Sequence, residues 1–250
     1  MIVIPMAGLS SRFANAGYKL PKYMLKANNK TLFSYSLKSF TNYYETQEFI
    51  FIGHDYNGVK DFINLETKLL GIKNYQIVLL NEQTKGQAET VFKGLASISE
   101  GNESPITIFN IDTFRPGFKF PTEFLKADIG GYLEVFKGDG NNWSYVLPDP
   151  IIKNKVIKTA EKNPISNLCC TGMYYFNSIN LFNHAFDEYK YVALKSMGLK
   201  ELFVAPMYNI LIEQNYNIKY TEIPKNDVIF FGTPPEYEAF LLESFEWFYS

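Results

Sequence analysis

The sequence contains little histidine, cysteine or arginine. Of its 250 residues, two are histidines, His54 and His184, and two are cysteines, Cys169 and Cys170. The histidines are far apart in the sequence, which leaves little material for a histidine-based zinc site or an imidazole-driven triad. The cysteines are adjacent in an apolar run, which is typical of buried thiols rather than of a disulfide framework. Catalytic chemistry is therefore expected from lysine, arginine and carboxylate side chains.

Long apolar runs and an excess of basic charge are absent as well. No run approaches the roughly 18 apolar residues of a membrane span, and the N-terminus lacks the charged segment and cleavage site of a signal peptide. The formal net charge is −2, so no basic face is expected to supply the counterion release that dominates nucleic-acid affinity. We expect a cytoplasmic protein that binds neither nucleic acid nor membranes.

Short β-rich runs recur along the chain. The first four, MIVIP, EFIFIG, YQIVLL and PITIFNID, alternate with segments of helical spacing over 31–44, 59–71 and 88–99. This order predicts an α/β fold with a doubly wound, mostly parallel sheet. Later strands are expected in IGGYLEVF, NWSYVL, KVIKTAEK, LCCTGMYYF and NIKYTEI. Because little helix separates these strands, they predict a mixed or antiparallel extension of the sheet. Helices are expected near 199–214 and 234–247. The whole chain, residues 1–250, is expected to form a single domain.

The loop after the first strand has an unusual composition. It follows the apolar IVIP, which places it at the carboxyl end of a parallel strand, where ligands bind in open α/β sheets. Gly8, Ser10 and Ser11 let backbone amides approach a phosphate, while Arg12, one of only two arginines, offers a fork for two phosphate oxygens. Lys22, which follows a proline, adds a point charge. The loop matches neither the dinucleotide fingerprint nor a P-loop, so it predicts a different polyphosphate site. A turn with two solvated basic side chains is the alternative.

The stretch GLSSRFANAGYKLPKYML resembles the signature of the sugar-phosphate nucleotidyltransferases, roughly G-x-G-x-R followed by a Pro-Lys pair. Ser10 departs from it, because the family commonly has glycine there. The segments NEQTKGQAETV, FNIDTF, TAEK and CCTGMYYF resemble further motifs in the family's order. The resemblance implies the nucleotide-diphospho-sugar transferase fold, which is GT-A-like. It also implies transfer of a nucleotidyl group from a nucleoside triphosphate to a phosphorylated acceptor, with release of pyrophosphate.

The resemblance also implies roles for individual residues. Arg12 and Lys22 are the implied catalytic pair. The implied nucleotide-binding residues are Met6, Ala7, Gly8, Ser10, Ser11, Gln83, Gly86 and Gln87. The implied acceptor-binding residues are Asp112, Glu161, Lys162, Thr171 and Gly172. Simpler interpretations stay open: a polar loop capping a helix for Gln83, an exposed ion pair for Glu161 and Lys162, and a buried strand for Thr171.

A magnesium ion is the expected cofactor. Asp112 follows an apolar strand, so its carboxylate is expected at the strand end, where it can hold Mg²⁺ against phosphate oxygens. The alternative is that Asp112 caps a helix. The segment NDVIFFGTPPEY resembles the family's final acidic strand, but Phe230 occupies the usual aspartate position. Asp227 is the nearest substitute and is the second candidate metal ligand.

The acceptor is inferred from resemblance alone. The chain is most similar to the short cytidylyltransferases of bacterial surface-polysaccharide gene sets that act on phosphoglutamine in capsular phosphoramidate synthesis, which implies CTP as donor. A sugar 1-phosphate is the alternative acceptor. A metal-dependent glycosyltransferase would normally show Asp-x-Asp where this chain has IDTF. A non-catalytic nucleotide-binding module is the other rival, favoured by Ser10 and Phe230. The aromatic tail FLLESFEWFYS is typical of core packing and compatible with a homo-oligomer interface.

Overall fold

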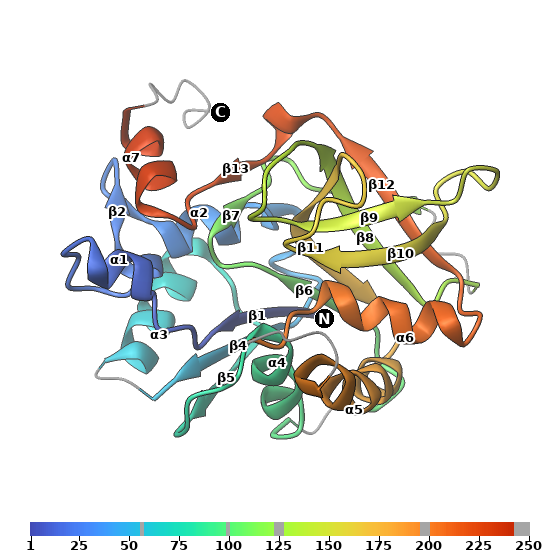
Figure 1. The fold of residues 1–250 in the computed structure, drawn as a ribbon. Helices are drawn as coiled ribbons and strands as arrows, with labels where there is room; N and C mark the ends of the chain where they lie inside the picture. The colour runs from blue at the N-terminus through green and yellow to red at the C-terminus, as the bar shows by residue number, and fades with distance from the viewer. Residues whose placement is uncertain (56–57, 99–100, 123–127, 196–200, 243–250) are drawn as a thin grey trace.

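The computed structural model describes residues 1–55, 58–98, 101–122, 128–195 and 201–242. Its main feature is a nine-stranded sheet (Figure 1). The sheet consists of β1 (Ile2–Met6), β4 (Phe49–His54), β5 (Tyr75–Leu80), β6 (Ile106–Phe109), β8 (Gly131–Lys137), β9 (Ser144–Pro148), β10 (Val156–Glu161), β11 (Leu168–Phe176) and β12 (Ile218–Ile223). Two short ribbons stand apart from it, formed by β2 (Lys26–Ala27) with β3 (Lys30–Thr31) and by β7 (Thr113–Phe114) with β13 (Ile229–Phe230).

The sheet has the predicted combination of parallel and antiparallel parts. β1 pairs in parallel with β4 and β6, and β4 pairs in parallel with β5. β11 then pairs antiparallel with β6, β8 and β9, while β12 adds to β8 in parallel. The path through the sheet is β10-β9-β11-β6-β1-β4-β5, with β8 and β12 branching from β11. The predicted α/β fold class, with a mostly parallel sheet and an antiparallel extension, is confirmed.

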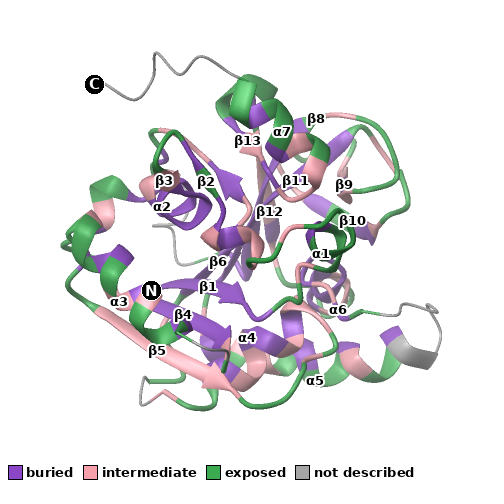
Figure 2. Cartoon of the chain, turned by 90° about the vertical axis from the view of Figure 1, so that its left-hand side faces the viewer, coloured by how far each residue is buried: buried purple, intermediate pink, exposed green. Residues whose placement is uncertain are grey.

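Helices cover both faces of the parallel strands because alternate strand residues point to opposite sides. On one face Ile2 and Ile4 pack with side chains of α2 (Leu32–Lys38) and α3 (Val59–Leu70). On the other, Val3 packs with α4 (Gln87–Leu95), α5 (Ile179–Lys195) and α6 (Tyr208–Glu213). Figure 2 shows β1 and β4 buried, whereas β5 is half-buried at the edge of the sheet. The parallel strands are therefore buried on two sides, which accounts for their continuous apolar sequences.

The helices differ from prediction in places. The longest described helix, α5, was not predicted, although Phe182, Phe186 and Tyr189 follow a helical period and are buried in the core. The helix expected from 199 begins later, as a 3₁₀ turn over Ala205–Met207 followed by α6. The helix expected over 59–71 ends as predicted, because Gly71 adopts a left-handed φ of 80° after the last helical residue.

The C-terminal region is described as far as residue 242. The helix expected over 234–247 is α7 (Pro234–Leu242), and most of the aromatic tail lies outside the described residues. Both cysteines are free and buried, as predicted. Within the described ranges, no helix is both long and apolar enough to cross a lipid bilayer.

Candidate active site

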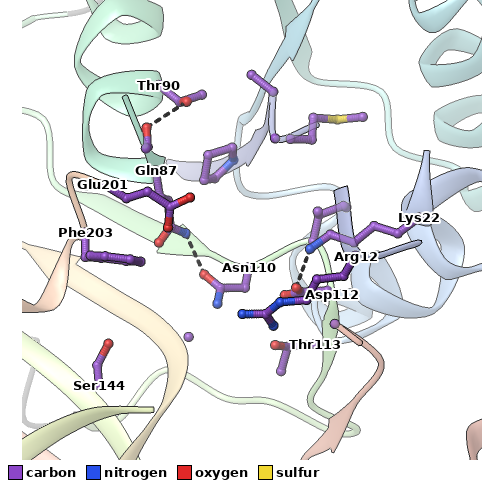
Figure 3. Close-up of a pocket in the computed structure, with 18 of the residues that line it drawn as sticks. Arg12, Lys22, Gln87, Thr90, Asn110, Asp112, Thr113, Ser144, Glu201 and Phe203 are labelled. Carbon is purple, nitrogen blue, oxygen red and sulfur yellow. Dashed lines mark hydrogen bonds and ion pairs between the residues drawn. The ribbon is translucent and has the colours of Figure 1, made fainter. Parts of the chain in front are cut away.

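A cleft of about 900 Å³ opens where β1 and β6 reach their carboxyl ends. It collects segments that are far apart in the sequence: the loop after β1, the loop after β5, the end of β6, and parts of β10 and β11. The predicted residues that line it are Met6, Ala7, Gly8, Ser11, Arg12, Lys22, Gln83, Gly86, Gln87, Asp112, Glu161, Lys162, Thr171 and Gly172. Figure 3 shows Arg12, Lys22 and Asp112 on one side, with Glu201, Phe203 and Ser144 on the other.

Ser10 and Lys22 are connected through the backbone of the loop. Ser10 has a left-handed φ of 51°, a conformation that favours glycine. Its hydroxyl accepts a hydrogen bond from the Lys22 backbone amide at 3.2 Å. Ser10 itself is not among the cleft-lining residues. A serine in place of the family's glycine therefore fixes the start of the Lys22 segment rather than contacting the cleft.

The short helix α1 (Ser11–Asn15) holds Arg12 at the rim of the cleft. Its one buried side chain, Phe13, makes an edge contact with Tyr237 of α7, with ring centroids 6.0 Å apart. Among the described residues no carboxylate pairs with the exposed Arg12 guanidinium. Its N–H donors are therefore available to an anionic ligand.

Lys22 and Asp112 form an ion pair inside the cleft. The Lys22 ammonium nitrogen lies 2.5 Å from Asp112 Oδ2, and each side chain is 22% exposed. The Asp112 carbonyl accepts a hydrogen bond from the Phe231 amide at 3.1 Å. A Cβ added to Gly232 would lie 2.6 Å from Asp112 Oδ2. The carboxylate is thus confined between Lys22 and the backbone of Gly232.

The loop after β5 is fitted against a distant segment of backbone. Gly86 has a φ of 140°, and a Cβ there would lie 2.5 Å from the Leu202 carbonyl oxygen. Leu202 donates its amide to the Lys85 carbonyl at 2.7 Å and accepts from the Ala88 amide at 3.0 Å. Glycine is therefore required at position 86 by packing as well as by backbone conformation. Gln83 and Gln87 line the cleft on either side of this contact.

Gln87 also orients Asn110, a residue that the sequence analysis did not single out. The Gln87 amide nitrogen donates to Asn110 Oδ1 at 2.5 Å (Figure 3). The Asn110 backbone amide donates to the Gly172 carbonyl at 3.1 Å. Gly172 has a φ of 96°, and a Cβ there would lie 2.5 Å from Asn110 Nδ2. The segment FNIDTF contains Asn110, so its position two residues before Asp112 was the signal that could have identified it.

Glu161 is the last residue of β10, Lys162 follows it, and both side chains line the cleft. Ser144 of β9 donates its hydroxyl to Glu161 Oε2. Burial raises the pKa of Glu161, while the bond from Ser144 and the charge of Lys162 oppose that rise. Lys162 has a left-handed φ of 54°, and its ammonium nitrogen lies 4.5 Å from the centre of the Phe203 ring.

Thr171 borders the cleft, but its hydroxyl faces a buried carboxylate. It donates to Glu134 Oε1 at 3.2 Å, and Arg115 Nε lies 3.1 Å from the same oxygen. Burial raises the pKa of Glu134, and the Arg115 charge opposes the rise. Arg115 also donates to the Asp227 carbonyl at 3.1 Å. The second arginine of the chain therefore links Glu134, which bonds Thr171, to the backbone of Asp227.

The structure does not bring Asp227 to the cleft. Asp227 is exposed in a 3₁₀ turn over Lys225–Asp227 and is not among the cleft-lining residues. Phe230 lines the cleft instead, and its ring packs against Trp143 with centroids 4.7 Å apart. Aromatic side chains thus occupy the place where a second carboxylate was sought. Among the described residues, no group of three or more histidine, cysteine or carboxylate side chains is arranged to hold a metal ion.

Comparisons with known proteins give a strong similarity. The crystal structure of a nucleoside-diphosphate-sugar pyrophosphorylase from Vibrio cholerae RC9 has a TM-score of 0.90 and 48% sequence identity, and the match covers 97% of this chain and 100% of that chain. No protein-family model matches the chain.

More distant proteins are also similar to the chain. The inositol-1-phosphate CTP transferase from T. maritima has a TM-score of 0.68 at 15% identity, covering 94% of this chain and 90% of that chain. The 2-C-methyl-D-erythritol 4-phosphate cytidylyltransferase of Petrotoga mobilis is 23% identical over 227 residues, which are 88% of this chain and 92% of that protein.

Proposed function

Because the chain belongs to the nucleoside-diphosphate-sugar pyrophosphorylase family of nucleotidyltransferases, we propose that it transfers a cytidylyl group from CTP to phosphoglutamine and releases pyrophosphate. The observation that carries the proposal is the convergence of Arg12, Lys22 and Asp112 on one cleft. Two cations can bind a polyphosphate together with the acceptor phosphate that approaches it, and the carboxylate can bind a metal ion between them. The sequence resemblance adds the proposed place in capsular phosphoramidate synthesis.

The proposed reaction is an in-line displacement at the α-phosphorus. An oxygen of the acceptor phosphate forms a bond to the α-phosphorus of CTP, and the bond from that phosphorus to the β-phosphate bridging oxygen breaks. A phosphomonoester has its second pKa near about 6, so its oxygen is already mostly ionised at neutral pH. The reaction then needs no general base, and the protein's tasks are positioning and charge neutralisation.

Under this proposal Arg12 and Lys22 have separate tasks. Arg12 holds the departing pyrophosphate, because a guanidinium contacts two oxygens at once. Lys22 bridges the α-phosphate and the acceptor phosphate, where an ammonium reduces the repulsion between two anions. For Lys22 to do so, its ammonium exchanges the Asp112 carboxylate for phosphate oxygens.

The carboxylate of Asp112 is a suitable ligand for a magnesium ion. Mg²⁺ commonly binds through one or two carboxylates, with phosphate oxygens and water completing the octahedron. The charged residues lining the cleft are Arg12, Lys22, Lys85, Lys162, Asp112, Glu161, Glu201 and Glu236, four cations and four anions. Such a balanced lining does not by itself neutralise a triphosphate. A magnesium ion held by Asp112 would supply that neutralisation.

The acceptor wall supports a small polar acceptor. Glu161 accepts hydrogen bonds, Lys162 is a cation for the acceptor phosphate, and Asn142 and Ser144 add polar groups. An amino-acid phosphate presents an ammonium group that a carboxylate such as Glu161 binds. A sugar 1-phosphate is the second candidate acceptor. It is favoured by the name of the 48% identical protein from Vibrio cholerae RC9.

The test measures pyrophosphate release with Mg²⁺ and each of four nucleoside triphosphates against phosphoglutamine, sugar 1-phosphates and other phosphorylated small molecules. We expect the highest kcat/KM for CTP with phosphoglutamine. Faster release with a sugar 1-phosphate would assign the alternative acceptor. Release of nucleoside diphosphate instead would indicate a glycosyltransferase, and nucleotide binding without turnover on any acceptor would indicate a binding module.

A further inference from the structure

Phe203 lies in the acceptor half of the cleft although its sequence neighbours belong to the core. Leu202 and Val204 are buried in the large hydrophobic cluster that contains α5 and α6. Phe203 is half-buried, lines the cleft, and is absent from the hydrophobic clusters of the described residues. Figure 3 shows its ring on the wall opposite Arg12 and Lys22. Leu202 and Val204 therefore anchor this backbone in the core, and the Phe203 ring faces the cleft.

The ring of Phe203 contacts the charged side chain of Lys162. The Lys162 ammonium nitrogen lies 4.5 Å from the ring centre, which is within the range of a cation–π interaction. The backbone of Lys162 is constrained as well, because its φ is 54° and its amide donates to the Trp143 carbonyl at 2.8 Å. A left-handed conformation in a residue with a side chain is energetically costly and is commonly retained at functional sites.

The segment that carries Phe203 is held by bonds on both of its sides. The Phe203 amide donates to the Tyr189 hydroxyl at 3.4 Å, and Leu202 is bonded to the loop of Gly86. Six residues after Phe203, the side-chain amide of Asn209 in α6 exchanges two hydrogen bonds with the backbone of Thr159, at 2.8 and 2.9 Å. Thr159 belongs to β10, the strand that ends at Glu161. The ring and the lysine are thus fixed to the same strand.

We infer that Phe203 is a positioning residue, which holds the Lys162 ammonium where it meets the acceptor phosphate. This inference rests on the proposed role of Lys162 in acceptor binding. A long exposed side chain such as that of Lys162 loses rotamer freedom on binding a phosphate. The aromatic face reduces that loss by keeping the ammonium on the acceptor wall before the acceptor arrives. Phe203 therefore contributes to acceptor affinity without contacting the reacting atoms.

The first test measures the position of Lys162 without any substrate. A methylene next to an ammonium that lies over an aromatic ring has its proton resonances shifted upfield. Protein with ¹³C-labelled lysine should show such a shifted Cε signal for Lys162, assigned by its loss in Lys162→Ala. This assignment distinguishes it from Lys190, whose ammonium nitrogen lies 5.2 Å from the centre of the Tyr191 ring. Phe203→Leu should move this signal to the region of the other lysines, while Phe203→Tyr, which keeps the ring, should retain it. An unchanged signal in Phe203→Leu overturns the inference.

The second test measures how the position of the Lys162 ammonium affects the KM for the acceptor. With CTP, Mg²⁺ and phosphoglutamine, Phe203→Leu should raise the acceptor KM about two- to fivefold, as expected for an exposed cation–π contact. The KM for CTP should stay unchanged, and Phe203→Tyr should restore the acceptor KM. In a Lys162→Ala background, Phe203→Leu should have no further effect, because the two residues act through one contact. Equal rises in both KM values, or additive effects in the double variant, would show a merely structural role and contradict the inference. Absence of turnover in the unaltered protein on every acceptor refutes the proposed function instead, and the resonance of Lys162 still decides the positioning.

Discussion

The Lys22 ammonium and the Asp112 carboxylate lie 2.5 Å apart, although 90 positions separate them in the sequence. Lys22 is fixed through its backbone amide to the Ser10 hydroxyl, and Asp112 is confined by the backbone of Gly232. In the protein without ligand, each group neutralises the other. Binding of a triphosphate with its metal ion then requires this pair to separate, so the two residues are coupled in the proposed reaction.

Replacement of Lys22 by alanine should remove most of the turnover. A cation between two approaching phosphates stabilises the transition state more than the bound substrates, so kcat should fall about 100- to 1,000-fold. The melting temperature should change little, because Asp112 remains partly solvated at 22% exposure. Lys19→Ala, at a nearby exposed lysine, is the matched control and should keep the activity of the unaltered protein. A Lys22→Ala protein with normal kcat at saturating substrates would refute the bridging role.

Arg12→Lys should impair the reaction despite keeping the charge. An ammonium cannot reproduce the two-pronged contact of a guanidinium, and a lost charged hydrogen bond of about 1.5–3 kcal/mol corresponds to about 10- to 150-fold in kcat/KM for CTP. Steady-state kinetics with varied CTP measures this change, with Arg12→Ala as the more severe variant. The idea fails if Arg12→Lys keeps kcat/KM within twofold.

The metal assignment predicts different behaviour for two aspartates. Asp112→Asn should lose activity at every Mg²⁺ concentration, because the cleft-facing carboxylate is the proposed ligand. Asp227→Asn should leave the Mg²⁺ dependence unchanged, since Asp227 is exposed outside the cleft. Rates measured against Mg²⁺ concentration for both variants, with a chelator as the zero point, distinguish the two. An active Asp112→Asn enzyme refutes the metal site, and a raised Mg²⁺ requirement in Asp227→Asn restores Asp227 as a ligand.

The hydrogen bond of Ser10 should stabilise the protein, whereas its left-handed backbone should destabilise it. Ser10→Ala removes the hydrogen bond to the Lys22 amide and keeps the left-handed backbone, so the free energy of unfolding should fall by about 1 kcal/mol. Ser10→Gly loses the same bond but relieves the backbone, and its stability should stay within about 0.5 kcal/mol of the unaltered protein. Denaturant titration of both variants measures the difference. Equal destabilisation by alanine and glycine would show that the backbone conformation is not strained.

The stability contribution of Glu161 should depend on pH. Burial raises the pKa of Glu161 above its ordinary value of 4.5, so the folded state favours the protonated form. Its contribution is full below pH 4.5 and is lost as pH rises through the raised pKa of the folded state. Relative to the unaltered protein, Glu161→Gln should therefore be more stable at pH 7.5 than at pH 4.5. Melting temperatures at the two pH values test this, with Glu213→Gln on the exposed end of α6 as the control. A difference that does not vary with pH contradicts the expectation.

The parallel part of the fold was predictable because its signals are local. Apolar runs such as those of β1 and β4, with helical periods between them, allow few connections other than right-handed parallel ones. The helix α5 was not predicted even though its buried residues have a helical period, because it follows a series of strands that predicts an antiparallel region. The 3₁₀ turn and late start of α6 were not predictable, since Leu202 is held by backbone bonds to the distant residues Lys85 and Ala88.

The sequence by itself determined the chemical types in the cleft: an arginine and a lysine in a small-residue loop, an aspartate after an apolar strand, and a Glu-Lys pair. Only the tertiary structure decided which of them meet. It paired Lys22 with Asp112, left Asp227 outside the cleft, and brought Asn110, Phe203 and Phe230 into it. The physical reason is that strand ends and backbone contacts between distant segments set these distances. Residue type and local spacing do not record them.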